Sequence, residues 1–348
     1  MKRYSISPTK CLVTIWSFLI TIWFLLVGKL YLIDLSNAQD NARMIERMNQ
    51  PCALLFFGLV KHFDDLALPS IQKNIVGPNH QCDIYLHTYN ITDLPVNPRN
   101  GEDHPARLNT SEAFLLTENV TMDTLEEFFT QRGEFLNHTR QYRYLGWGDC
   151  CQAHDNMIKQ WHSIQGVWNL MVQNEQILQK AMPMQHANND GAMHREAYFS
   201  RGYYQQIGFF RVDAYQVTPV DIFDSEAALP DFAHYTGFND RMFYGTRTYA
   251  AIWANRFAFS KTFEETYNAN AIHHHGYHSE SYLKYLMKHY EVPVELKPIC
   301  MWRIRSKRWL QGQDCRDMKR FGNFTQMVRF APPGYQRNGE FLAPSIEE

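Results

Sequence analysis

Two apolar segments of strand length, separated by an amphipathic stretch, constrain the fold of this chain most strongly. The first, ALLFFGLV at residues 53–60, is a continuous apolar run typical of a strand buried on both faces of a parallel sheet. A predicted helix follows, with Pro69 acceptable in its first turn, and CDIYLHT at 82–88 is the next predicted strand. Strand, helix and strand in this order make a right-handed βαβ unit. The sequence therefore predicts an α/β fold with a mixed, mainly parallel sheet flanked by helices.

The second half of the chain repeats the order of helix and strand. Residues 149–180 carry Trp161, Ile164 and Trp168 at helical spacing, which indicates core packing rather than a cofactor-binding motif. A polar loop leads from this helix to QIGFF, the next strand. The remaining elements are predicted as strands at 206–210, 242–244 and 292–302 and helices at 122–132, 246–259 and 279–290.

An apolar N-terminal segment predicts a membrane anchor. Residues 11–28 carry no charge, and the apolar pattern resumes after Lys29, so the segment is long enough to span a bilayer as a helix. Basic residues precede it and acidic residues follow it, which places the N-terminus in the cytosol and the rest in the lumen or outside the cell. The predicted parts are a cytosolic tail at 1–10, a signal-anchor helix at 11–33, a stem at 34–51, a luminal α/β domain at 52–330 and a C-terminal tail at 331–348.

Glycosylation acceptors and cysteines agree with this topology. Five Asn-x-Ser/Thr sites begin at Asn90, Asn109, Asn119, Asn137 and Asn323. An even number of cysteines follows the anchor, which suits disulfides in an oxidising compartment: Cys52, Cys82, Cys150, Cys151, Cys300 and Cys315. The last two would close a short loop, but spacing alone does not decide the pairing. The formal net charge of -2 gives no overall field that favours nucleic acid.

Two charged residues follow the strand predicted at 206–210. Arg211 and Asp213 fall where its carboxyl end is expected, and open α/β sheets bind ligands at that edge. An Asp directly after a strand is also typical of a turn or of a helix cap. The position therefore leaves two interpretations of Asp213, a ligand-binding group and a turn residue.

Two acids later in the chain are candidates for proton transfer. Asp240 lies just ahead of a predicted strand, and its alternative role is a surface ion pair with Arg241. Ser279 is the predicted N-cap of a helix, and Glu280 lies in its first turn, where the helix dipole favours an acid in any case.

Basic residues gather near the C-terminus. Arg303 and Arg305 are two positions apart, so they lie on one side of a strand and are placed to bind a diphosphate. The alternative interpretation is that the basic residues of this segment form a solvent-exposed face without a ligand.

The assembled motifs resemble those of type II Golgi glycosyltransferases. The segments FFGLVKHF, CDIYLHTYN, FFRVDAY, NDRMFYGTR and HSESYLKYLM are similar to a poorly characterised glycosyltransferase group with a GT-A-like fold. In that group an Arg-x-Asp stands where better-known members carry Asp-x-Asp. The resemblance covers residues 52–305.

The resemblance implies a Golgi membrane enzyme that moves a sugar from a nucleotide-sugar donor to a glycan or glycoprotein acceptor. The donor would lie across the first βαβ unit, where Gly58 allows close approach, and Asp213 would hold a divalent cation, Mn²⁺ or Mg²⁺, on its diphosphate. Because Arg211 replaces the first acid of the motif, either the metal binds weakly or the arginine itself neutralises phosphate. In an inverting enzyme Asp240, with Glu280 as second candidate, would deprotonate the acceptor hydroxyl.

Two other functional classes remain for comparison. A luminal binding or scaffold protein could keep the same fold without turnover, since the metal motif lacks one carboxylate. A sulfotransferase would need a Gly-rich basic phosphate loop after the first strand, and the sequence has none there.

Overall fold

The structure is a computed structural model that falls into two compact units, residues 1–50 and 51–348. The first unit is described only at Trp23, Lys29 and Gln50, so the predicted cytosolic tail and most of the anchor and stem lie outside the described residues, as does the C-terminal tail. No helix in the described part of the chain is long and apolar enough to cross a membrane. The described residues are 23, 29, 50–94, 106–147, 151–181, 202–268, 276–305, 310, 311 and 315.

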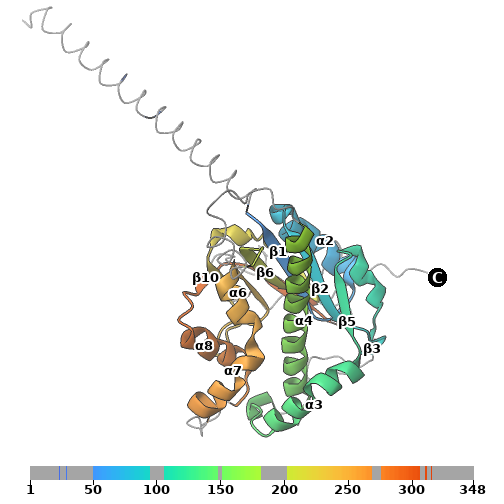
Figure 1. Cartoon of the computed structure of the whole chain (residues 1–348), viewed down its shortest axis with the longest axis vertical. Helices are drawn as coiled ribbons and strands as arrows, with labels where there is room; N and C mark the ends of the chain where they lie inside the picture. Colours follow the sequence, from blue (N-terminus) through green and yellow to red (C-terminus); the bar gives the residue numbers. More distant parts are fainter. Residues whose placement is uncertain are drawn as a thin grey trace, which may run out of the picture. The chain divides into compact units, whose positions relative to one another are not determined.

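A seven-stranded, mainly parallel sheet forms the centre of the second unit (Figure 1). The strand order is β10-β8-β9-β6-β1-β2-β5, and among these strands only the two pairs that include β9 are antiparallel. The predicted α/β fold with a mainly parallel sheet is therefore confirmed. The strands are β1 Cys52–Phe57, β2 Asp83–Tyr89, β5 Val120–Asp123, β6 Gln206–Arg211, β8 Ala227–Pro230, β9 Met242–Thr246 and β10 Glu295–Lys297.

A small antiparallel sheet has the strand order β12-β11-β7. In the chain, β7 directly follows β6, and β11 directly follows β10. Its strands are β7 Ala214–Gln216, β11 Met301–Ile304 and β12 Leu310–Gln311, while β3 Asp93–Leu94 pairs with β4 Ala106–Arg107. The strand predicted at 292–302 is wrong as a single element. It is divided between β10 and β11 in different sheets, since Pro298 lies between them and has no backbone N–H for a continuous ladder.

Helices cover both faces of the central sheet. Leu54 and Phe56 of β1 belong to one buried core, and Ala53, Leu55 and Phe57 belong to the other, as expected for a strand buried on both faces. Figure 1 shows α4 lying along β1 and β2. The α-helices are α2 Leu68–Ile71, α3 Leu125–Arg140, α4 Gln152–Ala181, α6 Arg247–Ala254, α7 Arg256–Phe263 and α8 Ser279–His289.

Short π and 3-10 segments complete the described chain. The helix predicted after β1 is a mixed one, because π-helical turns flank α2 on both sides. The bounds of these segments are η1 Phe63–Ala67, η2 Gln72–Val76, η3 Gly77–Asn79, η5 Thr110–Leu115, η6 Leu145–Trp147, η7 Ile222–Asp224 and η8 Glu264–Asn268.

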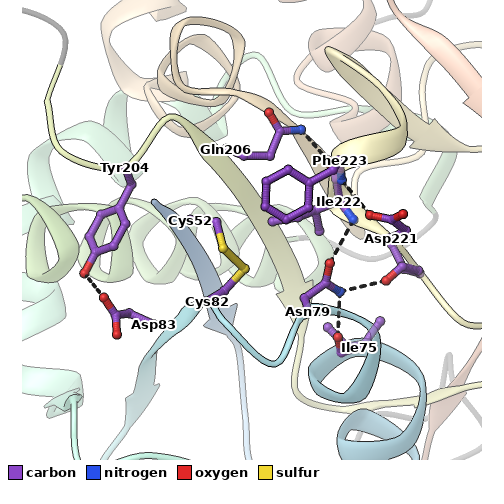
Figure 2. Close-up of a disulfide and its surroundings, with 11 residues drawn as sticks. Cys52, Ile75, Asn79, Cys82, Asp83, Tyr204, Gln206, Asp221, Ile222 and Phe223 are labelled. Carbon is purple, nitrogen blue, oxygen red and sulfur yellow. Dashed lines mark hydrogen bonds between the residues drawn. A yellow bond between two sulfur atoms is a disulfide. The ribbon is translucent and has the colours of Figure 1, made fainter. Parts of the chain in front are cut away.

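Two disulfides join described residues of the second unit. Cys52 at the start of β1 is bonded to Cys82, just before β2 (Figure 2). Cys300 is bonded to Cys315, which closes the short C-terminal loop considered from the sequence. Cys150 lies outside the described residues. The disulfides agree with the expectation of an oxidising compartment.

Side-chain hydrogen bonds surround the first disulfide. Figure 2 shows the Tyr204 hydroxyl donating to an Asp83 carboxylate oxygen at 2.5 Å. Asn79 donates to the carbonyl of Ile75 at 2.6 Å and accepts from the backbone N–H of Ile222 at 3.0 Å. The amino-terminal end of the sheet is therefore held together covalently and by hydrogen bonds.

Removing the first disulfide is expected to lower stability. The bond closes a loop with a sequence separation of 30, for which the loss of loop entropy in the unfolded chain corresponds to about 3 to 4 kcal/mol. The Cys52→Ala/Cys82→Ala variant should lose this amount of unfolding free energy in a guanidinium titration. Selective reduction of the same bond in the wild type serves as the control, and an unchanged midpoint would contradict the prediction.

Candidate functional site

The carboxyl edge of the central sheet has a topological switch point between β1 and β6. From β1 the chain passes to β2 and β5 on one side, then returns through α4 to β6 on the other side of β1. Ligands of open α/β sheets bind outside the carboxyl ends of the strands at such a point. Phe57 pairs with Arg211 in the register and accepts from the Val212 N–H at 3.1 Å, so Gly58 and Asp213 both lie just beyond the last paired residues of β1 and β6.

Gly58 has a backbone conformation at this edge that residues with a side chain rarely adopt. Its φ of +110° lies in the region that favours glycine, and its N–H donates to Ser163 Oγ of α4 at 3.0 Å. A Cβ at this position would be 3.8 Å from Asp213 Oδ1. A side chain at this position would therefore contact the buried Asp213 carboxylate.

Arg211 and Asp213 form a two-pronged ion pair. Arg211 Nε donates to Asp213 Oδ1 at 2.8 Å, and Nη2 donates to Oδ2 at 2.7 Å. Burial alone would raise the pKa of Asp213, but Arg211, Lys61 and Arg305 lower it to about 2. Asp213 lies in the turn between β6 and β7, as the turn interpretation expects, and its carboxylate is ionised. Each oxygen already accepts one hydrogen bond from Arg211, so a metal ion on Asp213 would have to share the carboxylate with the guanidinium or displace it.

Asp240 reaches the same edge because β9 is antiparallel and starts there. It is buried, and its Oδ2 accepts from Gln160 Nε2 at 3.1 Å and from the Ser279 hydroxyl. Burial opposes ionisation, yet Arg256, the Ser279 hydrogen bond and Arg241 hold the pKa of Asp240 below its usual value. Arg241 is buried as well, so the alternative of a surface ion pair is wrong.

The start of α8 differs from the prediction. The N-cap is His278, whose side chain accepts from the backbone N–H of Ser281, and Ser279 is the first helical residue. The predicted cap at Ser279 is therefore wrong. Its hydroxyl is instead directed to Asp240, an acid brought next to it from a distant part of the chain.

Glu280 has an environment unlike that of Asp240. Its side chain is 13% exposed, and Oε2 lies 3.4 Å from His278 Nε2. Burial and the nearby Asp240 charge raise the pKa of Glu280 to about 8, against the opposing charges of Arg241 and Arg303. At neutral pH Asp240 is therefore ionised, whereas Glu280 is mostly protonated.

The two predicted C-terminal arginines lie beside these acids. Arg303 pairs with Ala214 across the small sheet, and the backbone N–H of Ile304 donates to the Asp213 carbonyl at 3.0 Å. Arg305 contributes to the lowered pKa of Asp213, and Arg303 acts on Glu280. The fold thus brings all seven predicted site residues to one edge, although their roles stay predictions.

A buried arginine that the sequence did not indicate, Arg256, interacts electrostatically with Asp240. Arg256 is 0% exposed, its Nε donates to the Trp253 carbonyl at 3.2 Å, and its guanidinium lies over the Trp253 ring at 4.2 Å. Both Nη atoms lack a hydrogen-bond partner among the described residues. Burial lowers the pKa of Arg256 to about 10, and Asp240 is its main opposing charge. No local pattern marks such a residue, because its partner is distant in sequence.

A second polar group lies at the same sheet edge, toward β5. His87 Nε2 and His162 Nε2 are 3.1 and 2.6 Å from Asp123 Oδ2, and this His-Asp-His group could hold a metal ion. Such a group is compatible with the expected divalent cation, although it involves other residues than Asp213.

Comparison with known proteins adds no relative: no family model and no curated protein sequence matches the chain.

Proposed function

We propose that the protein is a glycosyltransferase with a GT-A-like fold, which moves a sugar from a nucleotide-sugar donor to a glycan or glycoprotein acceptor. One observation carries the proposal: a cationic cluster of Arg211, Lys61 and Arg305 lies at the same sheet edge as two acids. At neutral pH one of these acids, Asp240, is ionised and the other, Glu280, is mostly protonated. The switch point between β1 and β6 supports a nucleotide-sized ligand at this edge. The two disulfides support a luminal domain. The single-pass type II topology in the Golgi membrane is part of the proposal and rests on the apolar segment at residues 11–28 and on the resemblance of the sequence motifs.

The cationic cluster suits the diphosphate of the donor. Arg211, Lys61 and Arg305 all act on the single carboxylate of Asp213, so positive charge is in excess there. Guanidinium groups bind phosphate oxygens in a fixed geometry and stabilise charge that develops on a leaving group. In this proposal Asp213 orients Arg211, and Mn²⁺ or Mg²⁺ contributes less than in an Asp-x-Asp site.

Glu280 is the better candidate for the base of an inverting reaction. A general base works best when its pKa lies near the operating pH, and the pKa of Glu280 is about 8, whereas that of Asp240 is lowered. The Glu280 carboxylate would take the proton of the acceptor hydroxyl, whose oxygen bonds to the anomeric carbon as the bond to the diphosphate breaks. From the sequence, Asp240 was the first candidate for the base and Glu280 the second, so the proposal exchanges their ranks.

The test is turnover of donor by the purified protein. Hydrolysis and transfer should be measured across UDP- and GDP-sugars, with and without Mn²⁺ and with a chelator. We expect turnover of one donor class and only partial loss with the chelator. Failure to bind or turn over any nucleotide sugar would instead favour a binding or scaffold protein.

The pH profile should reveal the coupling between the two acids. Activity should rise with pH through about 8 as Glu280 loses its proton. Because the Asp240 charge raises that pKa, Asp240→Asn should shift the rising limb of kcat/KM to lower pH. Asp240→Asn also leaves Arg256 without its main counter-charge, so Asp240→Asn/Arg256→Gln serves as the charge-balanced control. An unshifted limb in both variants would contradict the coupling.

A further inference from the structure

We propose that His87, Asp123 and His162 form a binding site for a divalent transition-metal ion of the Zn²⁺ or Co²⁺ kind, separate from the donor site. Strand β2, strand β5 and helix α4 each supply one ligand, and the three ligand atoms lie within 4.8 Å of one another. Two imidazoles and a carboxylate suit such ions, whereas Mg²⁺ and Ca²⁺ prefer oxygen ligands alone. The proposal does not depend on transferase activity.

The surroundings of His87 fit a metal ligand. Its Nδ1 lies 2.9 Å from Ser163 Oγ, and that hydroxyl can donate to the His87 carbonyl at 3.1 Å. In the tautomer whose Nδ1–H donates to Ser163, the lone pair of Nε2 faces Asp123 Oδ2, and either a proton or a metal cation can lie between these two acceptors. A ligating histidine commonly donates its other N–H to an acceptor in this way. Because Ser163 also accepts from the Gly58 N–H, the site is connected to the switch point.

The packing of α4 leaves room for the His87 ring. A Cβ at Gly166 would lie 2.7 Å from His87 Nε2, closer than real Cβ atoms approach, so a glycine is needed at this turn of the helix. A side chain at position 166 would displace the ring. The Gly166→Ala variant therefore alters the site without removing a ligand atom.

The site is also reachable by an ion. His87 and His162 are buried, whereas the Asp123 side chain is 22% exposed. A pocket of about 180 Å³ opens onto the three residues, and its other lining side chains include Thr121 and Gln165. Water in this pocket can complete the coordination, as in metal sites that keep an open position.

Arg132 competes with the metal. Its Nε donates to His162 Nδ1 at 3.3 Å, but a neutral histidine that binds metal through Nε2 carries its proton on Nδ1. Arg132 must therefore release His162 when the ion binds, while it keeps its bond to Gln165 and its place over the Phe257 ring. Removing the guanidinium should strengthen metal binding, which a purely structural hydrogen-bond network would not predict.

The test is direct metal binding by the full-length protein after chelator treatment. Titration with Co²⁺, followed by visible absorption and then by Zn²⁺ displacement, should show one equivalent with imidazole and oxygen ligands. Asp123→Asn, His162→Gln and Gly166→Ala should each weaken binding by at least about tenfold, and Arg132→Gln should tighten it. His138→Gln, an exposed histidine on α3, should change nothing.

Three results would overturn the proposal: no stoichiometric Co²⁺ binding by the wild type, binding that the Asp123 and Gly166 variants leave unchanged, or a thiolate charge-transfer band that assigns the ion to cysteine. Circular dichroism of each variant separates loss of the site from loss of the fold. The readout is binding, so failure of the transferase proposal would leave this result unaffected.

Discussion

Replacing Glu280 with glutamine is expected to lower kcat for sugar transfer by about 10²- to 10⁴-fold, the contribution of a positioned general base. Glutamine keeps the shape of the side chain but cannot accept the proton of the acceptor hydroxyl. Because Glu280 lies on α8 and the proposed diphosphate-binding cations lie around Asp213, the KM for the donor should stay close to the wild-type value. The measurement is steady-state transfer at several donor and acceptor concentrations.

Stability gives an independent control for this variant. The pKa of Glu280 is raised from 4.5 to about 8 in the folded state, so the unfolded chain releases the proton first as pH rises. The wild type therefore loses unfolding free energy between those two pH values, and Glu280→Gln should not show this loss. A variant that is inactive yet at least as stable as the wild type at neutral pH excludes unfolding as the cause.

A matched substitution and one contrary outcome complete the test. Glu291→Gln changes an exposed acid just after the same helix and should leave kcat unchanged. If Glu280→Gln keeps full activity while Asp240→Asn abolishes it, Asp240 is the base, as the sequence had first suggested.

Much of the fold could be predicted because its main signals are local. The apolar run at 53–60, the strand around Phe209 and the long helix with Trp161 and Trp168 are patterns of periodicity, and each is found as β1, β6 or α4. Strand β5 was missed, since its four residues include Thr121 and Asp123 and have no apolar run. Short strands in a central sheet take their stability from neighbours that the sequence alone does not place.

The candidate site was predictable only in part, for a related reason. Arg211 and Asp213 follow a recognisable strand, and ligands of open α/β sheets bind at the carboxyl ends of strands, so both residues could be named as candidates from the sequence. The burial of Asp240 depends on the antiparallel direction of β9, and the pairing of His87 with His162 depends on the packing of α4 against β2. Such contacts join segments far apart in the chain, and no spacing in the sequence indicates them.

Replacing Arg211 with alanine is expected to lower transfer by about 10²- to 10³-fold, the loss typical of one group that stabilises a developing anion. The KM for the donor should rise too, because the same guanidinium is proposed to bind the diphosphate in the ground state. Arg211→Lys keeps the charge without the two-pronged geometry, so it should recover only part of the loss.

The Arg211→Asp variant decides between the two interpretations of the Arg-x-Asp motif. Alanine at position 211 frees both Asp213 oxygens, which now accept from Arg211 at 2.8 and 2.7 Å, and aspartate adds a second carboxylate beside them. Two carboxylates and a diphosphate form an oxygen-ligand set for Mn²⁺, so activity of this variant should return only with Mn²⁺ and disappear with a chelator. The wild type should retain most of its activity in that chelator. Complete loss of wild-type activity in the chelator, together with full activity of His162→Gln, would assign a required metal to Asp213 and not to the His-Asp-His group. An Arg211→Ala variant as active as the wild type would remove the arginine from diphosphate binding.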